Sequence, residues 1–427
     1  MLVGAVAAWQ PWRQAAPSRV AVAPDRPPIA VLDFSDPAAP VEDQQMARAY
    51  AEELTGELAR NADLSVIAAQ SSFAAGARGE SLQKVAERLG VGYLVSGSVR
   101  REGEQLRLLA QLVDGRDGRV VWTERHDVAA AQVYIVRDAL VQRIATSLQS
   151  TMRGNQETVA LQRPPASLDI YAMTMRGITL KHRFTPKDSA EAQALLERVV
   201  AQDPLYAPGW LYLGYVNAVD YSLALTGPRR PEKLRLAIEQ VERSVALDPR
   251  LSAAFGALSV YYPFAGRHDD GVRAGQRCME LAPSDADCMI FLAGTLNLAG
   301  QPELALPLAR RALAMNPLPP SYVQRFYGAT MWANGLLDEA LAALDGCLQA
   351  APKHNACRLD RAIARAEAGR IGEALADLAA WQSNVGPQLK PEVAANAAYS
   401  VKAQALIDRR LAALKALHGA SLAVVKP

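Results

Sequence analysis

Apolar residues recur at helical spacing throughout the second half of the chain, and the pattern itself repeats. Successive units end at Pro249, Pro283, Pro317 and Pro352, with separations of 283 − 249 = 34, 317 − 283 = 34 and 352 − 317 = 35 residues. A period of this length is typical of an array of antiparallel helix pairs. Proline marks each boundary because it cannot continue a helix. We therefore expect five to six helix pairs over residues 167–386.

Each unit also carries internal landmarks. The unit after Pro204 reads Trp210-x-x-Leu213-Gly214, and later units place comparable large and small residues in register. Over residues 167–381 this pattern resembles the tetratricopeptide family, in which small residues allow helices to approach closely and large residues fill the space between pairs. The one 35-residue unit needs an extra residue, which we assign to the turn at Asn334 and Gly335.

Ahead of the array, strand-like runs alternate with amphipathic helices over residues 29–150. One helix face carries an apolar residue every fourth position, at Met46, Tyr50, Leu54 and Leu58. The predicted order is strand, helix, strand, helix, three strands and helix, which is typical of a small mixed α/β domain. The predicted fold class is thus α+β: a small mixed α/β amino-terminal domain followed by an all-α tetratricopeptide solenoid.

The same segment carries a second resemblance. Over residues 29–148 the chain resembles the TolB amino-terminal-like domain of bacterial signalling proteins. The segments that carry this resemblance are residues 29–34, 64–67, 89–101 and 121–125. In that family the domain commonly lies between a membrane helix and a tetratricopeptide array, and the membrane helix follows a nucleotide cyclase or a winged-helix DNA-binding domain. The resemblance implies a signalling context and no activity of this segment itself.

The two ends of the chain and the linker lie outside the two predicted folded parts. Residues 1–9 are apolar and are followed by Trp12 and Arg13, which resembles the exit of a membrane helix. A full span needs about 20 apolar residues, so we interpret residues 1–28 as a partial membrane helix and a Pro/Ala-rich tether. A disordered apolar start is the alternative. Residues 151–166 are a predicted linker, and residues 387–427 are predicted capping helices and tail.

The composition and the motifs of the sequence argue against several classes of function. The 427-residue chain is half hydrophobic and has a net charge of only +2, which argues against a nucleic-acid partner. The sequence contains no G-x-x-x-x-G-K-[ST], H-E-x-x-H or G-x-S-x-G motif, and its five histidines are scattered. We therefore predict a protein that is not an enzyme, with no cofactor and no metal site.

The four cysteines form two equivalent pairs. Cys278 and Cys288 lie ten residues apart, as do Cys347 and Cys357, and each pair straddles the turn between two repeats. This regularity favours two disulfides and hence an oxidising compartment such as the periplasm. The alternatives are four small buried core residues, or a zinc site that gathers all four cysteines.

The first helix of each pair is expected to line the inner surface of the array, where an apolar groove would bind a peptide or a partner helix. Lys and Asn are missing from the positions where some tetratricopeptide proteins grip a terminal carboxylate, so we expect no carboxylate clamp. An alternative is that the segment from Gly386 onward covers part of this surface. The predicted partner groove consists of Leu211, Tyr215, Val260, Phe264, Ile290, Leu298, Gln324, Met331, Trp332, Leu359 and Ile363.

The predicted function is a non-enzymatic protein-interaction and signalling module at the periplasmic face of the inner membrane, with a membrane tether and a protein or peptide partner. One alternative is the regulatory part of a longer adenylate cyclase or winged-helix regulator. Another is a soluble cytoplasmic assembly factor, which would have reduced cysteines.

Overall fold

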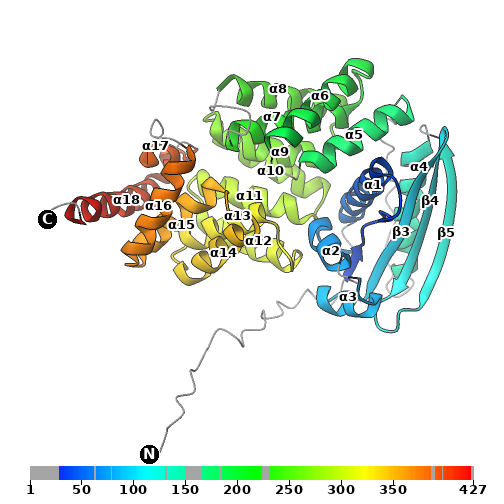
Figure 1. Cartoon of the computed structure of the whole chain (residues 1–427), viewed down its shortest axis with the longest axis horizontal. Helices are drawn as coiled ribbons and strands as arrows, with labels where there is room; N and C mark the ends of the chain where they lie inside the picture. Colours follow the sequence, from blue (N-terminus) through cyan, green and yellow to red (C-terminus); the bar gives the residue numbers. More distant parts are fainter. Residues whose placement is uncertain are drawn as a thin grey trace, which may run out of the picture.

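The computed structural model describes residues 28–61, 64–77, 79–129, 132–149, 166–181, 185–223, 231–385, 390–396 and 398–424. A five-stranded sheet with its helices comes first, and six antiparallel helix pairs follow (Figure 1). This order confirms the predicted fold class. The predicted partial membrane helix at residues 1–9, and all but the last residue of the predicted linker, lie outside the described ranges. Within those ranges, no helix is both long and apolar enough to cross a bilayer.

The sheet has the strand order β2-β1-β3-β4-β5. β1 runs parallel to both of its neighbours, whereas β3, β4 and β5 form antiparallel pairs. The middle of β3 requires a glycine, because a Cβ at Gly97 would lie 2.2 Å from the carbonyl oxygen of Leu109 on β4. The strands are β1 (Pro28–Val31), β2 (Ser65–Val66), β3 (Tyr93–Glu102), β4 (Gln105–Asp114) and β5 (Val120–Ala129).

Helices cover both faces of the sheet. On one face, α1 (Val41–Ala59) and α4 (Val133–Gln149) pack on inward-facing strand residues, and the predicted stripe on α1 is fully buried there. On the other face lie α2 (Ala69–Gly76) and α3 (Leu82–Leu89). The sequence pattern did not predict α2. The end of α3 is set by Gly90, whose φ of 67° is the left-handed conformation that commonly ends a helix.

The array keeps a regular geometry from pair to pair. The turns inside four of the pairs contain Gly266, Gly300, Gly335 and Gly369, each with φ between 76° and 83°. The six pairs are α5 (Leu168–Lys181) with α6 (Pro186–Gln202), α7 (Ala207–Leu223) with α8 (Pro231–Leu247), α9 (Ser252–Phe264) with α10 (His268–Leu281), α11 (Ala286–Leu298) with α12 (Pro302–Ala314), α13 (Ser321–Ala333) with α14 (Leu337–Ala350), and α15 (Asn355–Glu367) with α16 (Ile371–Val385).

The structure corrects where the extra residue of the 35-residue unit lies. The first helices of four successive pairs begin at residues 252, 286, 321 and 355, and the turn glycine follows each start by 14 residues. The turn at Asn334 and Gly335 therefore has the normal length. The extra residue lies instead in the connection between α12 and α13, residues 315–320.

This longer connection docks the array onto the sheet unit, with α1 and α2 between the sheet and the helix pairs (Figure 1). The amide of Ala68 donates to the carbonyl of Met315 at 3.0 Å, and the amide of Leu318 donates to the hydroxyl of Ser71 at 2.9 Å. One pair earlier, the hydroxyl of Ser284 donates to the carbonyl of Leu64 at 2.8 Å. The two parts of the chain thus share hydrogen bonds at successive inter-repeat turns.

The chain ends in a segment that returns to the array. After α17 (Pro391–Asn396), a short 3-10 helix (Val401–Ala403) leads into α18 (Gln404–Val424) at the end of the array far from the sheet. We call residues 398–418 the carboxyl-terminal strap. Its first part passes the turns of earlier pairs: His268 hydrogen-bonds to the carbonyl of Ala398 at 2.9 Å, and the amide of Ser400 donates to the carbonyl of Leu298 at 2.8 Å.

Candidate functional site

The predicted groove residues occupy equivalent positions on every first helix except α13. Ile290 lies four residues after the start of α11 (290 − 286), and Leu359 lies four residues after the start of α15 (359 − 355). Gln324, in contrast, lies only three residues after the start of α13 (324 − 321). This offset corrects the prediction and follows directly from the misplaced extra residue. The equivalent residue on α13 is Arg325.

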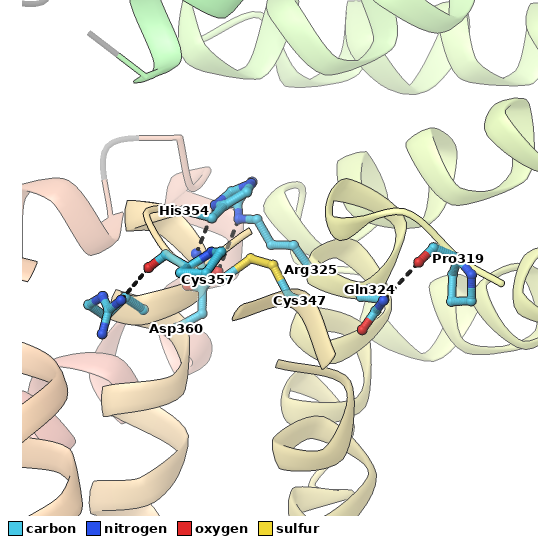
Figure 2. Close-up of a disulfide and its surroundings, with 9 residues drawn as sticks. Pro319, Gln324, Arg325, Cys347, His354, Cys357 and Asp360 are labelled. Carbon is cyan, nitrogen blue, oxygen red and sulfur yellow. Dashed lines mark hydrogen bonds and ion pairs between the residues drawn. A yellow bond between two sulfur atoms is a disulfide. The ribbon is translucent and has the colours of Figure 1, made fainter. Parts of the chain in front are cut away.

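Gln324 consequently faces the second helix of its own pair. Its amide nitrogen donates to the carbonyl of Pro319 at 2.7 Å (Figure 2). A Cβ at Gly346 on α14 would lie 2.0 Å from the amide oxygen of Gln324. The side chain is thus packed within the helix pair and does not line the inner surface of the array.

The structure divides the remaining groove residues into two groups. Six are buried, with at most 4% of each residue exposed, and cannot contact a partner in this conformation: Leu211, Ile290, Met331, Trp332, Leu359 and Ile363. Four are partly exposed: Tyr215, Val260, Phe264 and Leu298. Val260 and Phe264 pack against the core of α7 to α10, and Leu298 accepts a hydrogen bond from the strap.

The strap covers the carboxyl-terminal part of the predicted groove. Trp332 is 2% exposed and shares a hydrophobic cluster with Leu406 and Leu414 of α18. The guanidinium of Arg409 lies 4.5 Å from the centre of the Trp332 ring and donates to Glu367 at 2.7 Å. Glu367 also accepts the indole N–H of Trp332 at 2.7 Å. The alternative that the chain's own tail covers this surface is therefore confirmed at α13 and α15.

A buried ion triad fixes the strap at its centre. Asp360 of α15 accepts from Arg410 of the strap at 2.8 Å and from Arg325 of α13 at 3.2 Å. Burial raises the pKa of Asp360, but the positive charges of Arg325 and Arg410 outweigh it and hold the pKa below its ordinary value. The carboxylate therefore stays ionised and links α13, α15 and α18.

A second surface remains partly open where α1 approaches the array. We call it the acidic–aromatic patch, and it consists of Glu52 of α1, Tyr215 of α7, Asp287 and Phe291 of α11, and Tyr322 of α13, all partly exposed. The Tyr322 hydroxyl donates to Asp287 at 2.8 Å, and the Phe291 and Tyr322 rings lie 6.0 Å apart. Burial and then the charge of Asp287 raise the pKa of Tyr215, and Glu52 adds to this effect. Five side chains from four helices thus combine aromatic rings with two carboxyl groups.

Of the residues in the acidic–aromatic patch, the predicted partner groove included only Tyr215. Asp287, Phe291 and Tyr322 lie on first helices, at positions that the groove register did not include. Glu52 belongs to the sheet unit, and its approach to α7 and α13 depends on how that unit docks. The partial signal in the sequence was the density of aromatic residues on these helices.

Both predicted cysteine pairs are disulfides in the structure. Cys278 and Cys288 have Cα atoms 5.5 Å apart, and Cys347 and Cys357 have Cα atoms 6.4 Å apart. His354 lies beside the second disulfide, where its ring nitrogen accepts the Cys357 N–H at 3.3 Å (Figure 2). Burial, together with the charge of Arg325, lowers the pKa of His354 to about 4, so the imidazole is neutral at physiological pH.

The sheet unit contains a buried charge cluster. Arg137 of α4 is 2% exposed and lies 3.6 Å from a carboxyl oxygen of Glu53, 3.5 Å from one of Glu57 and 3.0 Å from one of Asp138. One guanidinium cannot balance three carboxylates in a dry environment. Burial raises the pKa of Glu53 to about 7, although the charge of Arg137 opposes this effect.

Known proteins are similar to only part of this chain. No family model matches the chain. A protein of Rhizobium meliloti (strain 1021) with the name "Putative adenylate cyclase 3" is 29% identical over 225 residues. The match includes 53% of this chain and 38% of that protein, so the chain spans well under half of the length of this relative.

Two solved structures are similar to part of the chain. A thermophilic TPR protein of Thermus thermophilus is 20% identical with a TM-score of 0.36, over 46% of this chain and 98% of that one. YrrB, a TPR protein described as having an unusual peptide-binding site, is 16% identical with a TM-score of 0.29, over 45% of this chain and 93% of that one.

Proposed function

We propose that this protein is a non-enzymatic interaction module whose partner is a peptide or protein segment carrying a basic residue. The observation that supports the proposal is the acidic–aromatic patch. Its two carboxyl groups, Glu52 and Asp287, lie among Tyr215, Phe291 and Tyr322. A Lys or Arg side chain gains both an ion pair with the carboxylates and a favourable contact with the ring faces at such a surface.

The strap provides a precedent within the same chain. Arg409 of α18 stacks on Trp332 and forms an ion pair with Glu367. An arginine on a helix that packs against the array therefore already binds one aromatic ring together with one carboxylate. The patch offers the same two chemical groups to a partner. This mode of recognition places helix-borne or extended basic residues against first helices of the array.

The experiment is a selection of random displayed peptides on the immobilised full-length chain, followed by binding titrations with the selected sequences. We expect the peptides to be enriched in Lys and Arg. Tyr215→Ala and Asp287→Asn should each weaken their binding at least roughly tenfold, which corresponds to the loss of one charge-assisted contact of about 1.4 kcal/mol. Glu239→Gln, on the exposed side of α8, is the control and should bind like the wild type. Peptides that bind all four chains equally would refute the role of the patch.

The strap regulates how much of the array a partner can reach. When α18 is in place, Arg409 and Arg410 lie over the Trp332 ring, and release of α18 would add the apolar area of Trp332 to the interaction surface. Arg409→Ala removes the ring contact and the ion pair with Glu367, and should speed amide hydrogen exchange in residues 404–418 about tenfold. Lys415→Ala, exposed on the same helix, is the control. If exchange rises in Arg409→Ala but the affinity of the selected peptides does not, the strap does not compete with the partner.

The place of this module in a larger system is a separate proposal. The match to a protein whose name is that of an adenylate cyclase, and the resemblance of residues 29–148 to a TolB-like signalling domain, support a regulatory role beside a cyclase or winged-helix output domain. The two disulfides support a periplasmic location, and the apolar pattern of residues 1–9 supports a membrane tether. Thiol alkylation of freshly lysed cells distinguishes this location from a cytoplasmic assembly factor, in which all four cysteines would be alkylated. Reading the DNA upstream in the same frame tests for an output domain.

A further inference from the structure

Three metal-ligating side chains meet at one turn of the array. Cys347 lies near the end of α14, Cys357 lies in the first turn of α15, and His354 precedes α15. One ligand atom from each of these residues lies within 4.8 Å of the others. Figure 2 shows the imidazole next to Cys357, on the turn that the disulfide spans. The chain therefore presents two sulfur atoms and a nitrogen atom in a Cys-x6-His-x2-Cys spacing.

His354 is a weaker helix cap than the residue at the equivalent turn of an earlier pair. Cys278 and Cys288 span the same ten residues, and the residue seven positions after the first cysteine is Asp285 there and His354 here (285 − 278 and 354 − 347). Asp285 accepts two backbone N–H groups, at 2.7 and 3.2 Å, as an ordinary N-cap residue does. His354 is the N-cap residue of α15, but it accepts only one backbone N–H, that of Cys357, at 3.3 Å, and histidine is not among the preferred N-cap residues.

We infer that reduction of the Cys347–Cys357 disulfide creates a binding site for Zn²⁺ or a similar thiolate-preferring divalent cation, with Cys347, Cys357 and His354 as ligands. Two thiolates and one imidazole form a ligand set that suits zinc, and a water molecule completes a tetrahedral site. Cys278 and Cys288 lack a histidine in their turn and remain a purely structural disulfide.

The chemistry balances with a dithiol as the reductant. The dithiol supplies two electrons and two protons, the S–S bond breaks, Cys347 and Cys357 become thiols, and the reductant forms its own disulfide. The cation then replaces the two thiol protons, which pass to the solvent. The resulting site has two negative charges from the thiolates and two positive charges from the ion. It is neutral, which suits residues that are both 0% exposed.

The nearby carboxylate does not compete for the cation. Arg325 and Arg410 both bind Asp360, so its oxygens are occupied. Two guanidinium groups and one carboxylate leave a net charge of +1 beside the turn, and a neutral site of one divalent cation and two thiolates adds nothing to it. The three proposed ligands all come from the α14–α15 turn, so cation binding requires no movement of the strap or of the sheet unit.

The experiment uses the full-length chain, reduced with excess dithiothreitol and desalted without oxygen, and titrated with Co²⁺ and then Zn²⁺. Reduced wild type should bind about one Co²⁺ with the visible absorption of a tetrahedral thiolate complex, and Zn²⁺ should abolish that absorption. The oxidised chain should show no such spectrum. Cys278→Ser with Cys288→Ser is the matched control and should keep the spectrum.

Two variants separate a true site from adventitious thiol binding. His354→Asn keeps a preferred N-cap residue, so the fold should be retained while the imidazole ligand is replaced by a neutral amide, and we expect at least roughly tenfold weaker Co²⁺ binding. Cys347→Ser with Cys357→Ser should abolish the spectrum. The inference is overturned if His354→Asn binds as tightly as the wild type, if the oxidised chain binds equally well, or if the control variant loses the spectrum.

Discussion

Replacing Glu53 with glutamine should remove a specific part of the pH dependence of stability. In the folded chain Glu53 lies against the buried Arg137, with Glu57 and Asp138 close by. Burial raises its pKa from 4.5 to about 7. Between these two values the folded chain holds a proton on Glu53 that the unfolded chain has released. Stability from this group is therefore fully present below about pH 4.5 and is lost as the pH rises to about 7.

The size of the effect follows from the width of that window. The folded and unfolded values differ by 7 − 4.5 = 2.5 pKa units. Each unit corresponds to about 1.4 kcal/mol, so Glu53 alone should lower the free energy of unfolding by roughly 3 kcal/mol between pH 4.5 and pH 7. Glu53→Gln does not titrate. The difference in stability between variant and wild type should therefore shift by this amount in favour of the variant across the window.

Urea denaturation at half-unit steps from pH 4 to pH 8 measures this difference, with circular dichroism and tryptophan fluorescence compared to establish that unfolding is two-state. Glu87→Gln on α3 is the control, because Glu87 is exposed and should leave the pH profile of the wild type unchanged. The comparison between chains cancels the contributions of titrating groups that lie far from Glu53, whereas Glu57 and Asp138 interact with Glu53 and are part of the measured difference. If the Glu53→Gln difference stays constant from pH 4.5 to pH 7, Glu53 is not the buried, proton-holding carboxyl group that its position indicates.

Two further substitutions test the buried ion triad and the close packing of β3 against β4. Asp360→Asn removes the negative charge that balances the strap arginine and Arg325, so the free energy of unfolding should fall by about 3–5 kcal/mol in urea denaturation; a loss below about 1 kcal/mol would contradict a buried triad. Gly97→Ala places a methyl group 2.2 Å from the Leu109 carbonyl oxygen and should cost about 1–3 kcal/mol by the same assay. Gly372→Ala, which meets no atom within 4 Å, should be neutral or stabilising, and equal effects at the two glycines would contradict the argument.

The features that the sequence predicts well are those set by local periodicity. The proline spacing locates the helix pairs, because each pair is a local unit that repeats the same turn. The cysteine pairs follow from the same period, since equivalent positions in two repeats experience the same geometry. Helix α2 escaped prediction because its eight residues, mostly small, show no amphipathic stripe.

The candidate site was harder to predict because it depends on contacts between distant parts of the chain. A spacing of 35 residues shows that one residue has been added to the unit, but it does not show at which turn. The apolar pattern is preserved whether the extra residue lies in the connection before α13 or in the turn at Asn334 and Gly335. The longer connection precedes α13, where Met315 and Leu318 hydrogen-bond to the sheet unit, and such contacts between distant segments leave no local pattern in the sequence. One residue of error rotates a helix by about 100°, which moved the prediction from Arg325 to Gln324 and hid the ion triad with Asp360.

An apolar stripe on a repeat array can face either a partner or another segment of the same chain. Trp332 is the kind of side chain expected in a partner groove, yet Arg409 and Arg410 of the last helix cover its ring. A terminal pair must be covered whether or not a ligand exists, because the outermost helices have no next repeat. Exposure distinguishes the two cases. Asp360, beneath the strap, is buried, whereas Glu52 and Asp287 of the acidic–aromatic patch are partly exposed. A surface of this kind, with acidic groups beside partly exposed rings, is where a basic partner gains most from binding.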